Sequence, residues 1–332
     1  MKKKAFLVTG GAGFIGSHVV DHLLSTGKLV VVLDDLSGGF RENVNKKAVF
    51  VKGSVVDTAL VKKLFKKYEF EYVFHLAAYA AEGLSHFIRK FNYENNLIGS
   101  INLINASVNS GVKCFVFTSS IAVYGSGQSP MKESMVPMPE DPYGVSKLAV
   151  EQDLRAAKEM FGMNYIVFRP HNVYGERQNI GDKYRNVIGI FMNKIMKNEP
   201  LPIFGDGLQM RAFTHINDVA PIIARSVENS NAYNQVFNLG ADKPYTVKEL
   251  AETVLREMGG SSKIEFHEAR NEVKVAYSDH SKAKKMFGTA APVSLGDGVR
   301  GMVAWAKENG ARSSKKFKNI EIMQKLPPFW LK

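Results

Sequence analysis

A glycine-rich turn close to the N-terminus is the feature that most constrains the fold. A short apolar run at residues 5–8 precedes Gly10, Gly13 and Gly16, and an amphipathic stretch at 14–25 follows. Glycines between a strand and a helix permit a tight turn, close approach of the backbone to a pyrophosphate, and close packing of the helix. The helix N-terminus then stabilises phosphate charge. The sequence therefore predicts a βαβ unit that binds a dinucleotide.

The rest of the first half repeats this alternation of short apolar runs with helical stretches. Near-continuous apolar strands that alternate with helices are typical of a parallel sheet covered on both faces. We predict an α/β fold, a Rossmann-type doubly wound parallel sheet with a smaller α/β C-terminal substrate domain. The expected strands are 5–8, 29–33, 49–52, 72–75, 114–118 and 165–168, and the expected helices are 14–25, 58–67, 91–109 and one that begins near Tyr143.

The pattern loosens after Arg169, so we place a boundary there. We expect an NAD-binding Rossmann domain at residues 1–170 and a substrate-binding region at 171–332, with helices near 187–196, 219–228 and 247–258. An apolar run at 236–239 predicts a strand, near 234–240, that returns to the main sheet. The two regions are therefore expected to be interleaved.

Composition excludes several classes of protein. The single cysteine, Cys114, rules out an intrachain disulfide framework. The chain has no CxxC or paired-histidine motif, so we predict no metal site. The net charge of +12 comes without a nucleic-acid-binding motif, and no apolar run approaches the 18 residues of a membrane span. The N-terminal apolar run is too short for a signal peptide. We expect a soluble cytoplasmic protein that binds neither nucleic acid nor membrane.

Acidic residues at the end of the second strand indicate the dinucleotide. Asp34 lies 18 residues beyond Gly16, where a carboxylate accepts hydrogen bonds from ribose hydroxyls and repels a 2′-phosphate. Asp35 is adjacent and can share this role; the alternative is that both are turn residues. The pattern favours NAD over NADP.

Tyr143 and Lys147 are a candidate catalytic pair. A spacing of four residues brings both side chains to one face of a helix. The unperturbed pKa of a tyrosine is about 10, and a fixed positive charge favours the phenolate. We therefore expect Lys147 to lower the pKa of Tyr143, which would let the tyrosine act as a base near neutral pH.

Four motifs in this order carry a family resemblance. They are Ser119-Ser-Ile-Ala-Val-Tyr-Gly125, Tyr143-x-x-x-Lys147, Arg169-Pro-His-Asn-Val-Tyr-Gly175 and Phe204-Gly-Asp-Gly-Leu-Gln-Met-Arg211. Together with the glycine turn, they resemble the extended short-chain dehydrogenase/reductase family, in particular its NAD-dependent nucleotide-sugar epimerases and dehydratases. The resemblance covers about residues 3–310.

The resemblance implies roles for particular residues. Ser120 would hydrogen-bond the reacting sugar oxygen, Tyr143 would serve as base and acid, and Lys147 would hold the nicotinamide ribose. Residues 79–86 differ from the family's usual sequence, and the resemblance implies that this segment would contact the hexose. The implied cofactor-binding residues are Gly10, Gly13, Phe14, Ile15, Gly16, Asp34, Asp35, Leu76, Ala77, Ala78, Asn96 and Lys147, and the implied substrate-binding residues are Ser120, Tyr143, Asn172, Asn186, Arg211 and Arg270.

The residues beside Ser120 indicate the reaction within this family. In the dehydratases of this family, the two positions that correspond to Ile121 and Ala122 hold a pair of acidic residues. This chain has no carboxylate at either position. The resemblance then implies an isomerase, namely NAD-dependent 4-epimerisation of a nucleotide-diphosphate sugar, such as UDP-glucose or UDP-galactose, through a transient 4-keto intermediate. A 4,6-dehydratase, another NAD-dependent sugar-nucleotide oxidoreductase and a non-enzymatic NAD-binding scaffold are the alternatives.

The family also implies a homodimer formed by the helices at 92–109 and 143–160. Ala276 falls near a position that limits bulk at C2 of the sugar, and a small residue there leaves room for an N-acetylated sugar. The sequence leaves both the sugar and the nucleotide open.

Overall fold

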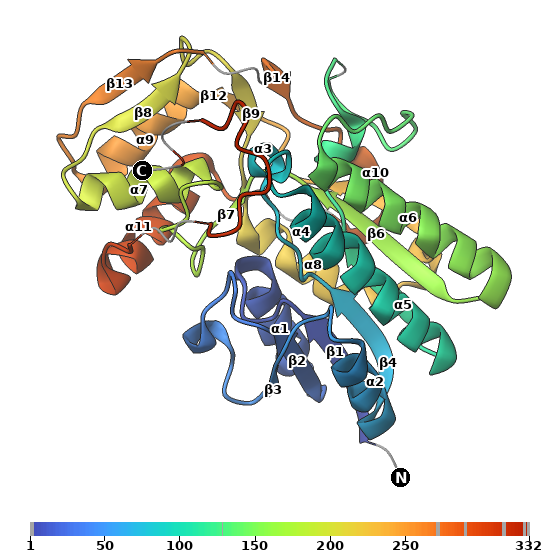
Figure 1. The fold of residues 1–332 in the computed structure, drawn as a ribbon. Coiled ribbons are helices and arrows are strands. Elements are labelled where there is room, and N and C mark those ends of the chain that lie inside the picture. The colour runs from blue at the N-terminus through green and yellow to red at the C-terminus, as the bar shows by residue number, and fades with distance from the viewer. Residues whose placement is uncertain are drawn as a thin grey trace.

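A parallel seven-stranded sheet forms the centre of the molecule (Figure 1). The computed structural model describes residues 3–127, 129–269, 273–288, 291–313, 317–327 and 330. The sheet has the order β11-β6-β5-β4-β1-β2-β3, so the predicted Rossmann-type sheet is confirmed. The strands are β1 (Lys3–Thr9), β2 (Val30–Asp34), β3 (Val49–Lys52), β4 (Tyr68–His75), β5 (Cys114–Thr118), β6 (Asn164–Pro170) and β11 (Gln235–Leu239).

The last of these strands comes from the second half of the chain. Strand β11 pairs in parallel with β6, with Gln235 opposite Ile166 and Leu239 opposite Pro170. It lies at the edge of the sheet beyond β6. The predicted returning strand is therefore present, and the second half of the chain contributes to the central sheet.

Helices cover both faces of the sheet because its strands are apolar on both faces. In β1, Phe6 and Val8 pack on one side while Ala5 and Leu7 pack on the other, as the period of two in a strand requires. The first side carries α1 (Phe14–Ser25), α8 (Ala220–Arg225) and α10 (Ser281–Phe287), and the second carries α2 (Thr58–Lys67), α5 (Gly99–Asn109) and α6 (Pro142–Phe161).

The helix predicted at 91–109 differs from the expectation. It consists of α4 (Arg89–Tyr93), a π-helical segment η2 (Glu94–Ile98) and α5. Wide π turns inside α-helices occur mostly at functional sites. This turn contains Asn96, whose side chain is buried and fully engaged by neighbouring groups, as described below.

The second half forms a smaller layer with its own core, in the upper left of Figure 1. The predicted helices at 187–196 and 247–258 are present, whereas the one expected at 219–228 is a short α-helix flanked by 3₁₀ turns. This layer contains α7 (Val187–Met196), α9 (Val247–Met258), α11 (Leu295–Asn309) and the strands β7 (Val173–Tyr174), β8 (Leu201–Phe204), β9 (Met210–Ala212), β10 (Thr214–His215), β12 (Pro244–Thr246), β13 (Ile264–His267) and β14 (Val275–Ala276).

Short helical turns complete the described chain. No helix in this part of the chain is long and apolar enough to span a membrane, and no group of three or more metal-ligating side chains occurs within it. The short elements are η1 (Arg41–Asn43), α3 (Glu82–Ser85), η3 (Ile121–Tyr124), η4 (Ile216–Asp218), η5 (Ser226–Glu228) and η6 (Ser230–Ala232).

Candidate active site

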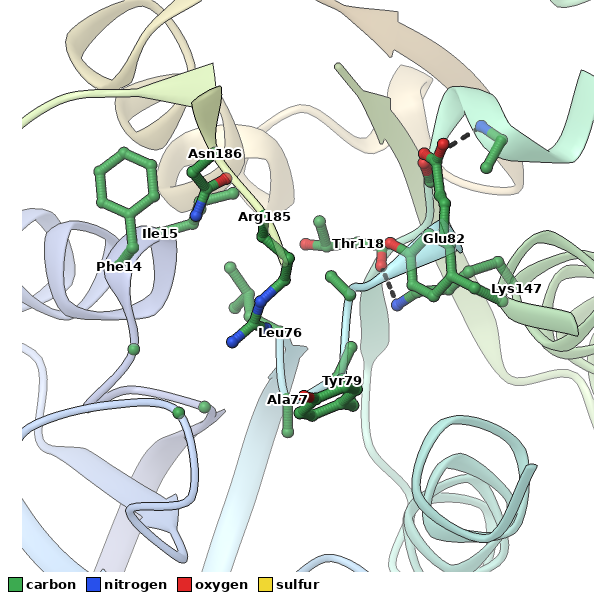
Figure 2. A pocket seen from close by; sticks show the side chains of 18 of the residues that line it. Phe14, Ile15, Leu76, Ala77, Tyr79, Glu82, Thr118, Lys147, Arg185 and Asn186 are labelled. Carbon is green, nitrogen blue, oxygen red and sulfur yellow. Dashed lines mark hydrogen bonds between the residues drawn. The ribbon is translucent and has the colours of Figure 1, made fainter. Parts of the chain in front are cut away.

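A cavity of about 900 Å³ opens at the carboxyl ends of the central strands. It runs from the glycine turn after β1, past the start of α6, to the N-terminus of α7 and strand β9. In open parallel sheets, ligands bind beyond the carboxyl ends of the strands. Figure 2 shows side chains from both halves of the chain converging on this space. This volume lies near the top of the range of about 300–1,000 Å³ that is typical of small-molecule and cofactor sites.

The glycine turn leaves room only for glycine at two of its positions. Gly10 has φ +72°, and a Cβ there would lie 2.7 Å from the backbone nitrogen of Ala77. A Cβ on Gly16 would lie 2.1 Å from the carbonyl oxygen of Gly10. Gly13 begins α1 without a side-chain cap, so the amides of the first turn face the cavity that Phe14 and Ile15 also line. This arrangement suits a pyrophosphate.

Asp34 lies at the carboxyl end of β2 on the wall of the same cavity. Its carboxylate accepts hydrogen bonds from the backbone amides of Ala12 (3.0 Å) and Leu36 (2.8 Å). Burial raises the pKa of Asp34 above its usual value, while these two hydrogen bonds oppose that rise. Asp35 also lines the cavity, and its carboxylate accepts a hydrogen bond from the Ser37 amide.

The start of α6 positions the tyrosine and lysine. Asp141 caps the helix through the amide of Gly144 (2.9 Å), and Pro142 occupies the first turn, where its missing N–H costs nothing. Tyr143 and Lys147 follow on the buried face of the helix, as predicted from their spacing. The Lys147 ammonium donates to the carbonyl oxygen of Thr118 at 2.8 Å (Figure 2). It lies 5.7 Å from the centroid of the Tyr143 ring.

Ser120 lies opposite this pair, at the end of β5. Its hydroxyl accepts a hydrogen bond from the Ala122 amide (3.1 Å), which caps the turn η3. A hydrogen bond between the Ser120 and Tyr143 side chains favours the phenolate form of the tyrosine. The Thr118 hydroxyl is buried beside them and has no hydrogen-bond partner in the protein. A polar group left unpaired on the cavity wall fits a site that binds a polar cofactor.

The electrostatics differ from the expectation drawn from the Tyr–Lys spacing. Burial raises the pKa of Tyr143 above its usual value, and the charge of Glu82 raises it further. Burial also lowers the pKa of Lys147 to about 7, so the ammonium is itself disfavoured there. The protein's own groups therefore do not lower the pKa of Tyr143, because desolvation outweighs the interactions that favour the phenolate; the expected lowering would need the second positive charge that an oxidised nicotinamide supplies.

A buried ion pair contacts Ser119, the residue before Ser120. Glu151, one turn beyond Lys147, binds Arg169 through two contacts of 3.0 and 2.5 Å. The same carboxylate accepts a hydrogen bond from the Ser119 hydroxyl (2.5 Å). The pair therefore connects α6 and β6 to the residue that precedes Ser120.

Two sequence-predicted residues stand apart from the others. Asn96 does not line the cavity: its amide accepts from the Tyr79 amide (2.7 Å) and donates to the Tyr79 carbonyl and the Asn92 side chain. It holds the chain that follows β4, so any effect on a cofactor is indirect. Arg270 lies outside the described residues.

The remaining predicted residues border the cavity. Leu76, Ala77 and Ala78 lie along it after β4. On the opposite side, Asn186 stands at the N-terminus of α7 with φ +66° and no side-chain cap. Arg211, on β9, donates to the Met210 carbonyl oxygen (2.9 Å). The cavity wall on this side contains Asn172, Asn186 and Arg211.

The structure adds residues that sequence reasoning did not identify individually. Arg185 donates to Asp182 (2.7 Å) and its guanidinium lies 4.9 Å from the centroid of the Tyr79 ring (Figure 2). Desolvation raises the pKa of Glu82 to about 7, and the charge of Asp141 adds to this effect. The unusual segment 79–86 was the only sequence signal for Tyr79 and Glu82. Nothing in the sequence marked Arg185.

Comparison with known proteins agrees with this geometry. A model of the NAD dependent epimerase/dehydratase family matches residues 6–240. A putative UDP-glucose 4-epimerase of Methanocaldococcus jannaschii is 36% identical over 91% of this chain and 98% of its own. The Thermotoga maritima UDP-glucose 4-epimerase, solved with UDP-glucose, has a TM-score of 0.88 at 35% identity, over 92% of this chain and 99% of its own.

A third relative differs in its sugar. The UDP-N-acetylglucosamine 4-epimerase of Methanobrevibacter ruminantium, solved with UDP-N-acetylmuramic acid, has a TM-score of 0.85 at 33% identity, over 93% of this chain and all of its own. The glycine turn, Asp34 and the Ser120–Tyr143–Lys147 group are thus found in a chain that resembles such enzymes along nearly its whole length. This chain belongs to the NAD dependent epimerase/dehydratase family.

Proposed function

We propose that this protein is an isomerase that uses NAD to epimerise a nucleotide-diphosphate sugar at C4, with a UDP-hexose such as UDP-glucose or UDP-galactose as its substrate. One observation carries the proposal. A single cavity joins the glycine turn, the Ser120–Tyr143–Lys147 group and the side chains of Asn172, Asn186 and Arg211. Two relatives that carry the name UDP-glucose 4-epimerase support UDP as the nucleotide of the substrate.

Each group in the cavity has a role in this reaction. Tyr143 removes the proton of the sugar 4-hydroxyl and later returns it, and Ser120 hydrogen-bonds the same oxygen. NAD, when bound, contributes a positive charge and reversible acceptance of the C4 hydride. Lys147 holds the nicotinamide ribose. Because burial and the charge of Glu82 both raise the pKa of Tyr143, the protein leaves the tyrosine protonated until a further positive charge is present.

Anchoring at the diphosphate allows the keto sugar to present its other face. Arg211 suits a diphosphate because a guanidinium binds two oxygens at once. Asn172 and Asn186 line the same wall, and the amides at the N-terminus of α7 add positive potential. The ligand stays attached through this end while the planar 4-keto sugar rotates within the cavity.

The alternative to epimerisation is 4,6-dehydration. No carboxylate stands at Ile121 or Ala122, which argues against it. However, Glu82 lines the cavity, its charge acts on Tyr143, and its pKa of about 7 suits an acid that assists loss of water. A reductase that releases NADH is a further alternative, and product analysis separates all three.

The sugar and the assembly belong to the same proposal. Ala276 is buried on the cavity wall, where its small side chain leaves space for an N-acetyl group. Ile98 and Val145 are exposed apolar residues on neighbouring helices, which supports a homodimer through these helices.

We place the enzyme in the cytoplasm and divide it into an NAD-binding region, 1–170, and a substrate-binding region, 171–332.

Product analysis by NMR tests the reaction. The purified protein is incubated separately with UDP-glucose, UDP-N-acetylglucosamine and UDP-glucuronate, with and without added NAD. The C4 epimer of at least one substrate is expected, without net accumulation of NADH. A 4-keto-6-deoxy product or stoichiometric NADH would replace the proposal with one of the alternatives.

The Tyr143→Phe variant tests the base. It should lower kcat by about 10²–10⁴-fold while bound NAD is retained, because only the proton-transfer group is lost. Tyr68→Phe, a change in the core below the sheet, is the matched control and should leave kcat unaltered. Near-normal turnover in Tyr143→Phe would remove this residue from the mechanism.

A further inference from the structure

We propose that the C-terminal segment, described here at residues 317–327 and 330, forms a wall of the sugar-binding part of the cavity and sets which sugars are accepted. This inference rests on the proposed function. In Figure 1 the dark red trace of this segment passes close to α3. The alignments with two solved relatives cover nearly all of each relative and 92–93% of this chain.

The segment is hydrogen-bonded to the start of α4. The carboxylate of Glu321 accepts from the backbone amides of Lys90 (2.7 Å) and Phe91 (2.9 Å). The amides of Glu321 and Ile322 donate to the carbonyl oxygen of Phe87 at 2.8 and 3.2 Å. A carboxylate at a helix N-terminus pairs with free amides and with the positive end of the helix dipole. The segment thus holds the chain that runs from Tyr79 to α4.

Aromatic contacts join the segment to both halves of the molecule. The Phe317 ring lies 5.4 Å from that of Tyr79 and 4.9 Å from that of Phe91, centroid to centroid. The Trp330 ring lies 5.7 Å from Phe87 and 5.6 Å from Tyr184. Edge-to-face pairs of this kind add to the stabilisation from burial. The aromatic cluster therefore connects the loop after β4 with the loop before α7.

Trp330 reaches the cavity itself. Trp330 and Pro327 both line it, and a Cβ on Gly83 would lie 3.3 Å from the Trp330 ring. Lys183 donates to the Trp330 carbonyl oxygen (3.1 Å), which fixes the backbone at this point. A large rigid ring on a cavity wall limits the size of the ligand and gives apolar contact area.

The position of this wall identifies the part of the ligand it meets. Its partners, Tyr79, Gly83 and Tyr184, flank Glu82 and Arg185, and Glu82 acts on the pKa of Tyr143. The glycine turn and Asp34 lie at the other end of the cavity. The segment is thus placed to contact the sugar, whereas the cofactor and the diphosphate are held by other residues.

Binding measurements test this without relying on turnover. The dissociation constants of UDP, UDP-glucose and UDP-N-acetylglucosamine are measured by calorimetry for the NAD-loaded wild type, Trp330→Ala and Met323→Ala. Met323 is the matched control because it lies on the same segment with 59% of its surface exposed. For Trp330→Ala, we expect at least a fivefold change in the ratio of the two UDP-sugar constants, with the UDP constant and NAD content unchanged within twofold.

The outcomes separate this inference from the proposed function. An unchanged ratio in Trp330→Ala overturns the role of the segment, even if the wild type epimerises both sugars. Equal loss of affinity for UDP and for both UDP-sugars also overturns it, because the segment then only stabilises the fold. Wild-type protein that binds the sugars but makes no epimer contradicts the proposed function alone.

Hydrogen exchange in Glu321→Gln gives a second, activity-independent readout. Exchange at the Lys90 and Phe91 amides should become at least tenfold faster as their charged acceptor is weakened, and kcat/KM should fall while NAD stays bound. Unchanged protection of both amides contradicts the proposed attachment.

Discussion

Removing the Glu151 carboxylate should destabilise the protein through a charge left behind in its interior. Glu151 and Arg169 have side chains that are 5% and 4% exposed, and they share two short contacts. In Glu151→Ala the guanidinium stays buried without its partner. One of its nitrogens, Nη1, has no hydrogen-bond partner among the described residues of the wild type, and the Tyr124 hydroxyl, which hydrogen-bonds the Arg169 side chain, is the neutral partner that remains.

The size of the effect follows from the cost of breaking a buried ion pair. Loss of one partner costs about 3–5 kcal/mol. Contact between Arg169 and the Tyr124 ring, at 4.7 Å, is present before and after the substitution, so it does not change the difference. We therefore expect a loss of about 3–5 kcal/mol, a large part of a typical total of about 5–15 kcal/mol.

Guanidinium unfolding of the cofactor-free protein measures this loss as a change in the free energy of unfolding. Glu159→Ala is the matched control, because Glu159 pairs with Arg155 on the same helix at 65–73% exposure and should cost less than about 0.5 kcal/mol. The Ser119 hydroxyl also loses its acceptor beside Ser120, so kcat should fall in Glu151→Ala only. A loss below about 1 kcal/mol would refute the reasoning.

Two further predictions follow from the shifted pKa values. Because burial lowers the pKa of Lys147 to about 7, against about 10.4 in an unfolded chain, the cost of its charge is fully present below pH 7 and vanishes above about pH 10.4. Lys147→Met should therefore raise the free energy of unfolding of the cofactor-free protein, measured in urea, by up to about 4 kcal/mol more at pH 6 than at pH 10. Turnover should be lost in this variant. An equal change in stability at both pH values would contradict the reasoning. Because the Glu82 carboxyl has a pKa of about 7 and its charge raises the pKa of Tyr143, Glu82→Gln should shift the pH–kcat profile to lower pH; an unmoved profile would exclude this coupling.

Local patterns were sufficient for the sheet and for the centre of the site. Six apolar runs of strand length, the glycine turn and the spacing of Tyr143 and Lys147 each depend on residues near one another in sequence, and all are found as predicted. The returning strand β11 was also predicted from its apolar run. The π-helical turn around Asn96 was missed, because its hydrogen bonds to Tyr79 join segments that no periodicity relates.

The sequence by itself determined the fold class and the dinucleotide turn and supplied the candidates for the reacting side chains, since these depend on residue type and short-range spacing. Only the tertiary structure decided how those side chains are charged, because desolvation depends on everything packed around Tyr143, Lys147 and Glu82. It alone brought Arg185 into the cavity and Trp330 onto its wall. Such contacts arise where distant parts of the chain meet, and a pattern read along the sequence does not contain them.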